Sequence, residues 1–148
     1  MATEWGYCQA NGPETWAKCF PQAAGPRQSP VDIRSVNTKI LKTNDCLSWK
    51  YEPKNMIDIT NTGYGWKVHV NSEGSELVGG PLEDKYILEQ FHCHWGETND
   101  KGSEHTMNGK AYAGELHLVH WNASKYSSFA EAAEQPDGLT VLGIFLQP

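Results

Sequence analysis

The chain has 148 residues, a net charge of −6 at neutral pH, 39% hydrophobic residues and a mean hydropathy of −0.59. This length and composition predict one soluble, globular domain over residues 1–148. The acidic balance and the lack of a basic run argue against nucleic acid or an anionic membrane surface as a partner. No apolar stretch approaches the roughly 20 residues of a membrane-spanning helix.

The N-terminal residues show no charged region followed by an apolar core, so the sequence predicts no secretory signal and a cytoplasmic location. Four cysteines are present, and none of them forms a Cys-x-x-Cys pair. In a chain without a secretory signal we expect reduced thiols. The four are Cys8, Cys19, Cys46 and Cys93.

The N-terminal part of the chain is rich in glycine and proline, which predicts a long irregular segment. Residues 11–14, Asn-Gly-Pro-Glu, are expected to open a short helix with Pro13 near its first turn. Trp5 and Trp16 are expected to fasten this segment to the rest of the chain through apolar contacts.

Beyond the N-terminal segment the sequence alternates in the manner of strands. Residues 47–51, 56–61 and 66–70 each alternate apolar and polar side chains, which predicts three strands. Residues 79–82, Gly-Gly-Pro-Leu, predict a turn between these strands and the next part of the chain.

The C-terminal part predicts one short helix and one further strand. Ser127 or Ser128 is expected to cap the helix, with Glu131 as the capping-box partner. The apolar run over residues 139–146 predicts a buried strand. The fold class expected is therefore α+β and strand-dominated, a twisted sheet with short helices and long loops.

Two runs near the middle of the chain carry the histidines that suggest a function. Residues 90–96 read Gln-Phe-His-Cys-His-Trp-Gly, and residues 113–122 read Ala-Gly-Glu-Leu-His-Leu-Val-His-Trp-Asn. Successive side chains of a strand point to opposite faces. Gln90, His92 and His94 therefore share one face of the first run.

By the same alternation Glu115, His117 and Val119 share a face of the second run. If the two runs are neighbouring strands, three imidazoles converge, namely those of His92, His94 and His117. Three neutral imidazoles with an open fourth position for water are the ligand set of a catalytic zinc. A single histidine on a sheet is more often a packing or surface residue, but three of matching alternation favour a metal.

The same face offers polar partners for the histidines. Metal-bound imidazoles usually donate their second N–H to a carboxylate or a carbonyl, and Gln90 and Glu115 are placed to accept. Asn108-Gly109 is the strongest turn signal in the chain, and a two-residue loop there would set Glu104 opposite Ala113. Glu104 should then face the same site. Cys93 has the opposite alternation and is expected in the core.

Seven segments carry a resemblance to a known family: QFHCHWG, GSEHT, ELHLVHWN, QSPVDI, GGPL, QPDGL and VLGIFL. In order and spacing, along nearly the whole chain, they resemble the α-class carbonic anhydrases. The resemblance implies that zinc is bound by His92, His94 and His117. It implies that Gln90 and Glu115 support these ligands, and that Glu104 partners a threonine which orients the attacking hydroxide.

The resemblance also assigns residues around the site. Tyr7 would line the active-site water network. Tyr64 takes the place where fast cytosolic members carry a histidine proton shuttle, and a phenol shuttles protons poorly near neutral pH. An apolar wall for carbon dioxide would be formed by Val119, Phe129, Leu139 and Val141.

The implied fold is a large, mostly antiparallel central sheet with zinc at the base of a conical cleft. The implied activity is the reversible hydration of carbon dioxide to bicarbonate and a proton, with a role in pH regulation, by a monomer that uses Zn²⁺. Family domains are longer than this chain, which stops directly after the apolar run at residues 139–146. We therefore expect a truncated, N-terminal portion of the domain and weak activity.

Two alternatives stay open on the sequence alone. One is a catalytically silent relative that binds zinc and acts as an interaction module. The other is a cupin-like iron or manganese protein, because His92-x-His94 followed by Glu97 loosely resembles such sites. Zinc content together with sulfonamide-sensitive hydration of carbon dioxide separates these readings.

Overall fold

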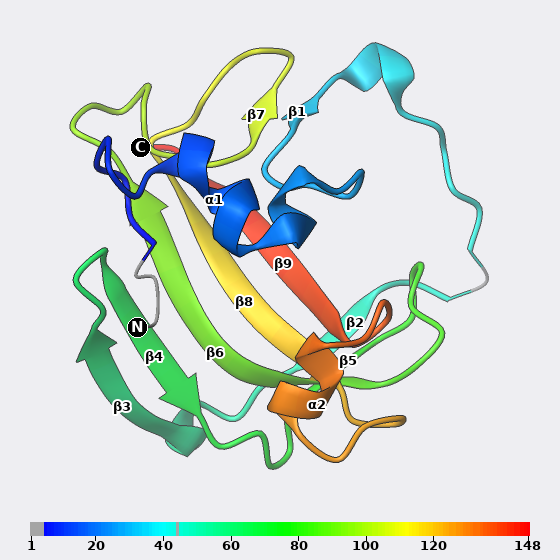
Figure 1. Ribbon diagram of the computed structural model, residues 1–148. Helices are drawn as coiled ribbons and strands as arrows, with labels where there is room; N and C mark the ends of the chain where they lie inside the picture. The colour runs from blue at the N-terminus through cyan, green and yellow to red at the C-terminus, as the bar shows by residue number, and fades with distance from the viewer. Residues whose placement is uncertain (1–4, 44) are drawn as a thin grey trace. The chain divides into compact units, whose positions relative to one another are not determined.

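The computed structural model of the chain describes residues 5–43 and 45–148. The chain divides into two compact units, Met1–Val31 and Asp32–Pro148. The second unit contains the sheet and all of the residues discussed as metal ligands. Figure 1 shows the elements of both units in the order of the chain.

The first unit contains the helix expected near Pro13. This helix, α1, spans Pro13–Cys19 with proline in its first turn, and a short 3-10 helix, η1 (Pro21–Ala24), follows it. Proline is favoured there because the first turn of a helix does not use its N–H groups. The rings of Trp5, Tyr7 and Trp16 pack edge to face, with centroids 5.8 to 6.1 Å apart. The two tryptophans thus contact each other within this unit, while their expected contact with the rest of the chain stays a prediction.

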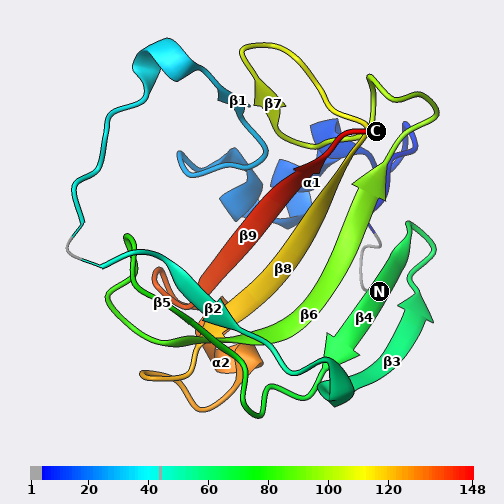
Figure 2. The same cartoon turned by 180° about the vertical axis from the view of Figure 1, so that it is seen from behind.

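The second unit is built on a seven-stranded antiparallel sheet with β6 at its centre (Figures 1 and 2). β8 runs along one edge of β6, and β4 and the short β5 share the other edge. β9 continues the sheet beyond β8, β3 beyond β4, and β2 beyond β5. The strands are β2 (Ser48–Lys50), β3 (Met56–Asn61), β4 (Trp66–Val70), β5 (Glu76–Val78), β6 (Tyr86–Trp95), β8 (Gly114–Asn122) and β9 (Leu139–Leu146).

Smaller elements surround this sheet. β1 (Asp32–Ile33) and β7 (Thr106–Met107) form a separate two-stranded parallel pair. Two further 3-10 helices are η2 (Ser35–Asn37) and η3 (Pro53–Asn55). The strand-dominated α+β class with a mostly antiparallel sheet and short helices is confirmed. None of the helices in the described part of the chain has the length and apolar character needed to cross a membrane.

The short C-terminal helix α2 (Phe129–Ala133) is capped as the sequence predicts. Ser128 is the N-cap, and its Oγ accepts a hydrogen bond from the backbone N–H of Glu131. The carboxylate of Glu131 in turn accepts from the N–H and the hydroxyl of Ser127. Both candidate serines therefore take part, and the reciprocal bond of the capping box goes to the residue before the cap.

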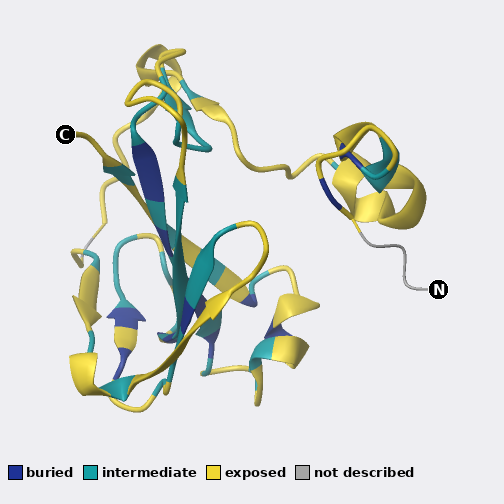
Figure 3. Ribbon diagram, turned by 90° about the vertical axis from the view of Figure 1, so that its left-hand side faces the viewer, coloured by how far each residue is buried: buried dark blue, intermediate teal, exposed yellow. Residues whose placement is uncertain are grey.

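The core lies along β6 and β8, where buried residues concentrate (Figure 3). The prediction that residues 139–146 form a buried strand is right about the strand and wrong about its burial. Leu139, Val141, Ile144 and Leu146 on β9 are 38 to 47% exposed. β9 pairs with β8 alone among the described strands, so one edge and much of its apolar surface face solvent.

Candidate metal site

The register of β6 and β8 brings the predicted ligands to one place. His92 lies opposite His117, His94 opposite Glu115, and Gln90 opposite Val119. Residues directly opposite each other on neighbouring strands share a face. The two histidine runs are therefore neighbours, as the alternation of the sequence suggested.

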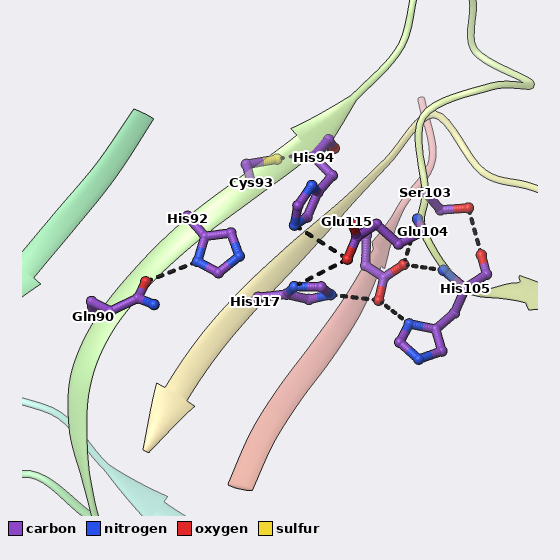
Figure 4. A network of polar contacts seen from close by, with 9 residues as sticks. All are labelled: Gln90, His92, Cys93, His94, Ser103, Glu104, His105, Glu115 and His117. Atoms are coloured by element: carbon purple, nitrogen blue, oxygen red, sulfur yellow. Dashed lines mark hydrogen bonds and ion pairs between the residues drawn. The ribbon is translucent and has the colours of Figure 1, made fainter. Parts of the chain in front are cut away.

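The three rings converge closely (Figure 4). The ring centroids are 5.0 Å apart for His92 and His94, 5.2 Å for His92 and His117, and 4.8 Å for His94 and His117. One nitrogen from each ring lies within 4.8 Å of the others. We refer to these residues as the three-histidine cluster.

Hydrogen bonds on the far side of two rings determine which nitrogen faces the centre. His92 Nδ1 lies 2.8 Å from Gln90 Oε1, and His117 Nε2 lies 2.7 Å from Glu115 Oε1. Each of these nitrogens must carry the proton, because both partner atoms are acceptors. The lone pairs of His92 Nε2 and His117 Nδ1 are then left for a metal.

The third ring supplies the clearest sign that a cation fits. His94 Nε2 is buried and makes no hydrogen bond, with only the Glu104 carboxylate 3.4 Å away, although buried polar atoms are nearly always satisfied. A zinc ion held by His92 Nε2, His94 Nε2 and His117 Nδ1 would satisfy this atom and leave a fourth position open. The residues present therefore fit the group that the sequence implies.

The electrostatics of the cluster favour neutral imidazoles, which is the form that binds metal. Burial, with smaller contributions from His94, His117 and Lys67, lowers the pKa of His92 to about 4. Burial also lowers the pKa of His94, which Glu104 partly offsets. Protons therefore compete little for these nitrogens at neutral pH.

Glu115 is the most heavily bonded side chain near the cluster and is only 2% exposed. Its Oε1 accepts from the rings of His105 and His117, both at 2.7 Å, and its Oε2 accepts from the N–H groups of Glu104 at 2.9 Å and His105 at 2.8 Å. Burial alone would raise the pKa of Glu115, but these hydrogen bonds hold it at about 2. The carboxylate is therefore charged and fixes the ring of His117. We refer to this set as the Glu115 network.

His105 was missed by the sequence reasoning. It lies beside Glu104 in the Gly-Ser-Glu-His-Thr segment, which served only as a mark of family resemblance. Its ring binds Glu115 and so connects the loop before β7 to β8. Its position directly after Glu104, a predicted site residue, is the sequence feature that could have indicated a role for His105 in the site.

His105, Glu115 and His117 also form a second group whose ligand atoms lie within 4.8 Å of one another. In this group the carboxylate accepts one hydrogen bond from each ring at 2.7 Å, so the nitrogens facing it carry protons. Protonated nitrogens have no lone pair for a metal. The three-histidine cluster is the better metal site.

Glu104 faces the cluster, but not by the expected pairing. Its Oε2 lies 3.4 Å from His94 Nε2 and 3.8 Å from His117 Nδ1. The predicted two-residue turn is present, with positive φ at Asn108 and Gly109.

The prediction that a regular strand ladder runs from this turn and pairs Glu104 with Ala113 is wrong. Met107 and Lys110 exchange both backbone hydrogen bonds, but further along Ser103 N–H donates to Tyr112, which shifts the register. β1 takes the free edge of β7, and the Glu115 carboxylate binds the N–H of Glu104. These two long-range contacts replace the hairpin ladder.

The residues expected to form an apolar wall are partly on the face of the cluster. Val119 is buried beside His117, and Val141 lies opposite Val119 on β9. Leu139 is two residues along and has the same alternation as Val141. Phe129 is half-buried on α2. A role in holding carbon dioxide stays a prediction for all four.

The two tyrosines lie on different units of the chain. Tyr64, 57% exposed, is in the turn between β3 and β4 and lines an open hollow with Trp66 and Trp95. Tyr7 belongs to the first unit, where its ring packs on Trp5 and Trp16. The roles assigned to Tyr64 and Tyr7 stay predictions, as does the catalytic role of Glu104. Cys93 lies opposite Leu116 on the other face of the sheet, as predicted, but it is half-buried and not in the core.

A glycine on β9 makes room for the Glu115 network. Gly143 lies opposite His117, and a Cβ at this position would come 3.1 Å from Glu115 Oε1. We expect Gly143→Ala to displace the carboxylate and to weaken zinc binding roughly tenfold, since partners that orient metal ligands contribute on this scale. Competition with a chromophoric chelator measures the affinity. Ile144→Ala, the next residue and on the other face, is the control, and an affinity loss equal in both variants would contradict the steric explanation.

Comparisons with known proteins identify the family of the chain. A family model of eukaryotic-type carbonic anhydrases matches residues 11–148. Carbonic anhydrase 7 of Homo sapiens is 50% identical over 145 residues, which is 97% of this chain and 55% of that protein. Carbonic anhydrase 1 of Mus musculus is 47% identical over 148 residues, which is 99% of this chain and 57% of that protein.

The chain belongs to the eukaryotic-type carbonic anhydrase family. It spans little more than half the length of these relatives. Family membership excludes the cupin-like alternative, and Glu97 lies outside both metal-capable groups found among the described residues.

Proposed function

We propose that this chain carries a zinc centre of the carbonic anhydrase type and catalyses the reversible hydration of carbon dioxide to bicarbonate and a proton. The observation that carries the proposal is the convergence of three imidazoles whose free lone pairs face one point. Family membership supports carbon dioxide and bicarbonate as the substrates. A cytoplasmic location, a monomeric state and a single incomplete domain over residues 1–148 remain predictions of the sequence.

His92, His94 and His117 would hold the metal, and Gln90 and Glu115 would orient two of the three rings. Zinc, when bound, acts as a Lewis acid that makes water acidic enough to lose a proton near neutral pH, and carbonic anhydrase is the standard example of this chemistry. The charged carboxylate of Glu115 increases the donor strength of the His117 ring.

Glu104 has a different task in this proposal. Its carboxylate oxygen lies 3.4 Å from His94 Nε2, next to the lone pairs that face the centre. A carboxylate in this place can accept a hydrogen bond from a group at the open position and so orient the reacting oxygen toward the carbon. Orientation of this kind is worth on the order of a hundredfold in rate.

A second candidate function, zinc binding without catalysis, is favoured by the exposure of the apolar wall. Leu139 is 39% and Val141 is 47% exposed, so the face beside the cluster is partly open to water. Electrostatic stabilisation of a reacting group is strongest where water is excluded. A protein of this kind would bind zinc without catalysing hydration and would act as an interaction module.

Stopped-flow hydration of carbon dioxide, with zinc content measured on the same sample, separates the two functions. We expect sulfonamide-sensitive catalysis that follows the zinc content of the 148-residue chain. Glu104→Gln should keep the zinc and lose about a hundredfold in rate. Full zinc content without any sulfonamide-sensitive rate would favour the silent alternative, and a sample without zinc would contradict both.

A further inference from the structure

Two histidines of the chain have no part in the site, and one of them is partly exposed to solvent. The chain has six histidines. Three form the cluster, His105 belongs to the Glu115 network, and His120 is fully buried, where it bonds to the hydroxyl of Tyr51. His69 on β4 is the sixth, and its side chain is 36% exposed.

The register of the sheet places His69 on the same face as the cluster. His69 lies opposite Gln90 on β6, and its strand neighbour Lys67 lies opposite His92. His69 and His92 are diagonal neighbours on adjacent strands, and such residues are roughly 7–8 Å apart. His69 is thus beside the cluster without belonging to it.

A carboxylate on the next strand fixes the ring of His69. Asp58 of β3 lies opposite His69, and its Oδ1 is 2.8 Å from His69 Nδ1. Thr60 Oγ1 donates to the same oxygen at 3.3 Å. The hydrogen bond from His69 lowers the pKa of Asp58, which is therefore charged at neutral pH. Nδ1 must carry the proton, and Nε2 then has a lone pair.

We propose that His69, oriented by Asp58, accepts the proton that hydration of carbon dioxide releases and passes it to buffer; this rests on the proposed function. Carbon dioxide and water give bicarbonate and one proton, which must leave the site in every cycle. Water carries the proton to Nε2 of the neutral ring, Asp58 stabilises the cation through Nδ1–H, and a buffer base removes the proton from Nε2.

The chemistry of the neighbouring groups suits this task. Imidazole is the side chain that changes its charge between pH 5 and 8. The groups that face His69 are Asp58 and Thr60 on β3, Lys67 on its own strand, and uncharged Gln90 with His92 on the diagonal of β6.

Exchange of ¹⁸O between bicarbonate and water tests the proposal, because it reports two rates at chemical equilibrium. Interconversion of carbon dioxide and bicarbonate needs no proton from the relay, whereas loss of label into bulk water does. We expect His69→Ala to lower the rate of label loss into bulk water roughly tenfold and to leave the interconversion rate unchanged. Added imidazole should restore the rate of label loss. Asp58→Asn should lower the rate of label loss by a smaller factor than His69→Ala does. Glu73→Gln, with the same change of charge on the exposed turn after β4, is the control.

A second readout does not depend on activity. Long-range ¹H–¹⁵N spectra of the zinc-free chain, recorded at a pH where the spectra show a neutral ring, should place the proton of His69 on Nδ1, and Asp58→Asn should reduce this preference. A proton on Nε2 would contradict the proposal. So would an unchanged loss of label in His69→Ala when interconversion is catalysed. An absence of catalysed interconversion in the parent chain would contradict the proposed function itself, and the relay with it.

Discussion

His94→Ala should remove the bound zinc that the parent chain holds at about one ion per chain. His94 Nε2 is a buried nitrogen without a hydrogen-bond partner, and the variant deletes this ligand atom while leaving the Glu115 network in place. Loss of a residue that only orients a ligand costs 10 to 100-fold in affinity, so loss of a ligand should cost more than about a hundredfold. Zinc analysis after dialysis, with chelator competition, gives the affinity.

Cys93→Ser is the matched control for this variant. Cys93 is adjacent to His94 but points to the opposite face, where it donates to a backbone carbonyl. The control should therefore retain its zinc. Full zinc content in His94→Ala, or loss of zinc in Cys93→Ser, would contradict the assignment of the ligands.

The second large effect is expected at Glu115. Glu115→Gln replaces a carboxylate that accepts four hydrogen bonds by an amide with one acceptor atom, so at least two buried donors lose their partner. We expect the free energy of unfolding to fall by roughly 2–4 kcal/mol. Zinc affinity should fall 10 to 100-fold, because the ring of His117 is no longer fixed. Urea unfolding and chelator competition measure the two effects, with Glu97→Gln on an exposed loop as control.

The variant should also change the response to acid. The pKa of Glu115 is about 2, below the ordinary value of 4.5, so its contribution to stability is complete above pH 4.5 and is lost as the pH falls toward 2. Glu115→Gln should lack this part of the acid dependence. A parallel loss of stability in both proteins between pH 4.5 and 2.5, in the absence of zinc, would show that the carboxylate is not stabilised as described.

Alternation within strands carried most of what could be predicted about the site. The side-chain period of a strand is fixed at two, so His92, His94 and His117 could be assigned to faces without knowledge of the fold. What remained was whether β6 and β8 are neighbours, and the structure confirms it. The same rule predicted the limits of β3 and β4, where alternating residues are bounded by turn signals.

The features that escaped prediction depend on contacts between distant residues. The burial of β9 depends on how many strands flank it, and β8 is its one neighbour among the described strands. The apolar sequence of β9 does not reveal this number. The register before β7 is decided by β1 and by the Glu115 carboxylate, not by the turn alone. The pairing of Asp58 with His69 required the register of β3 and β4.

Anomalous scattering at the zinc absorption edge, from crystals of the zinc-loaded chain, shows directly whether the three-histidine cluster binds the metal. We expect one strong peak bonded to His92 Nε2, His94 Nε2 and His117 Nδ1, with Glu115 in contact with His117 Nε2 and not with the metal. A peak bonded to His105, Glu115 and His117, or no peak at the three-histidine cluster, would contradict it.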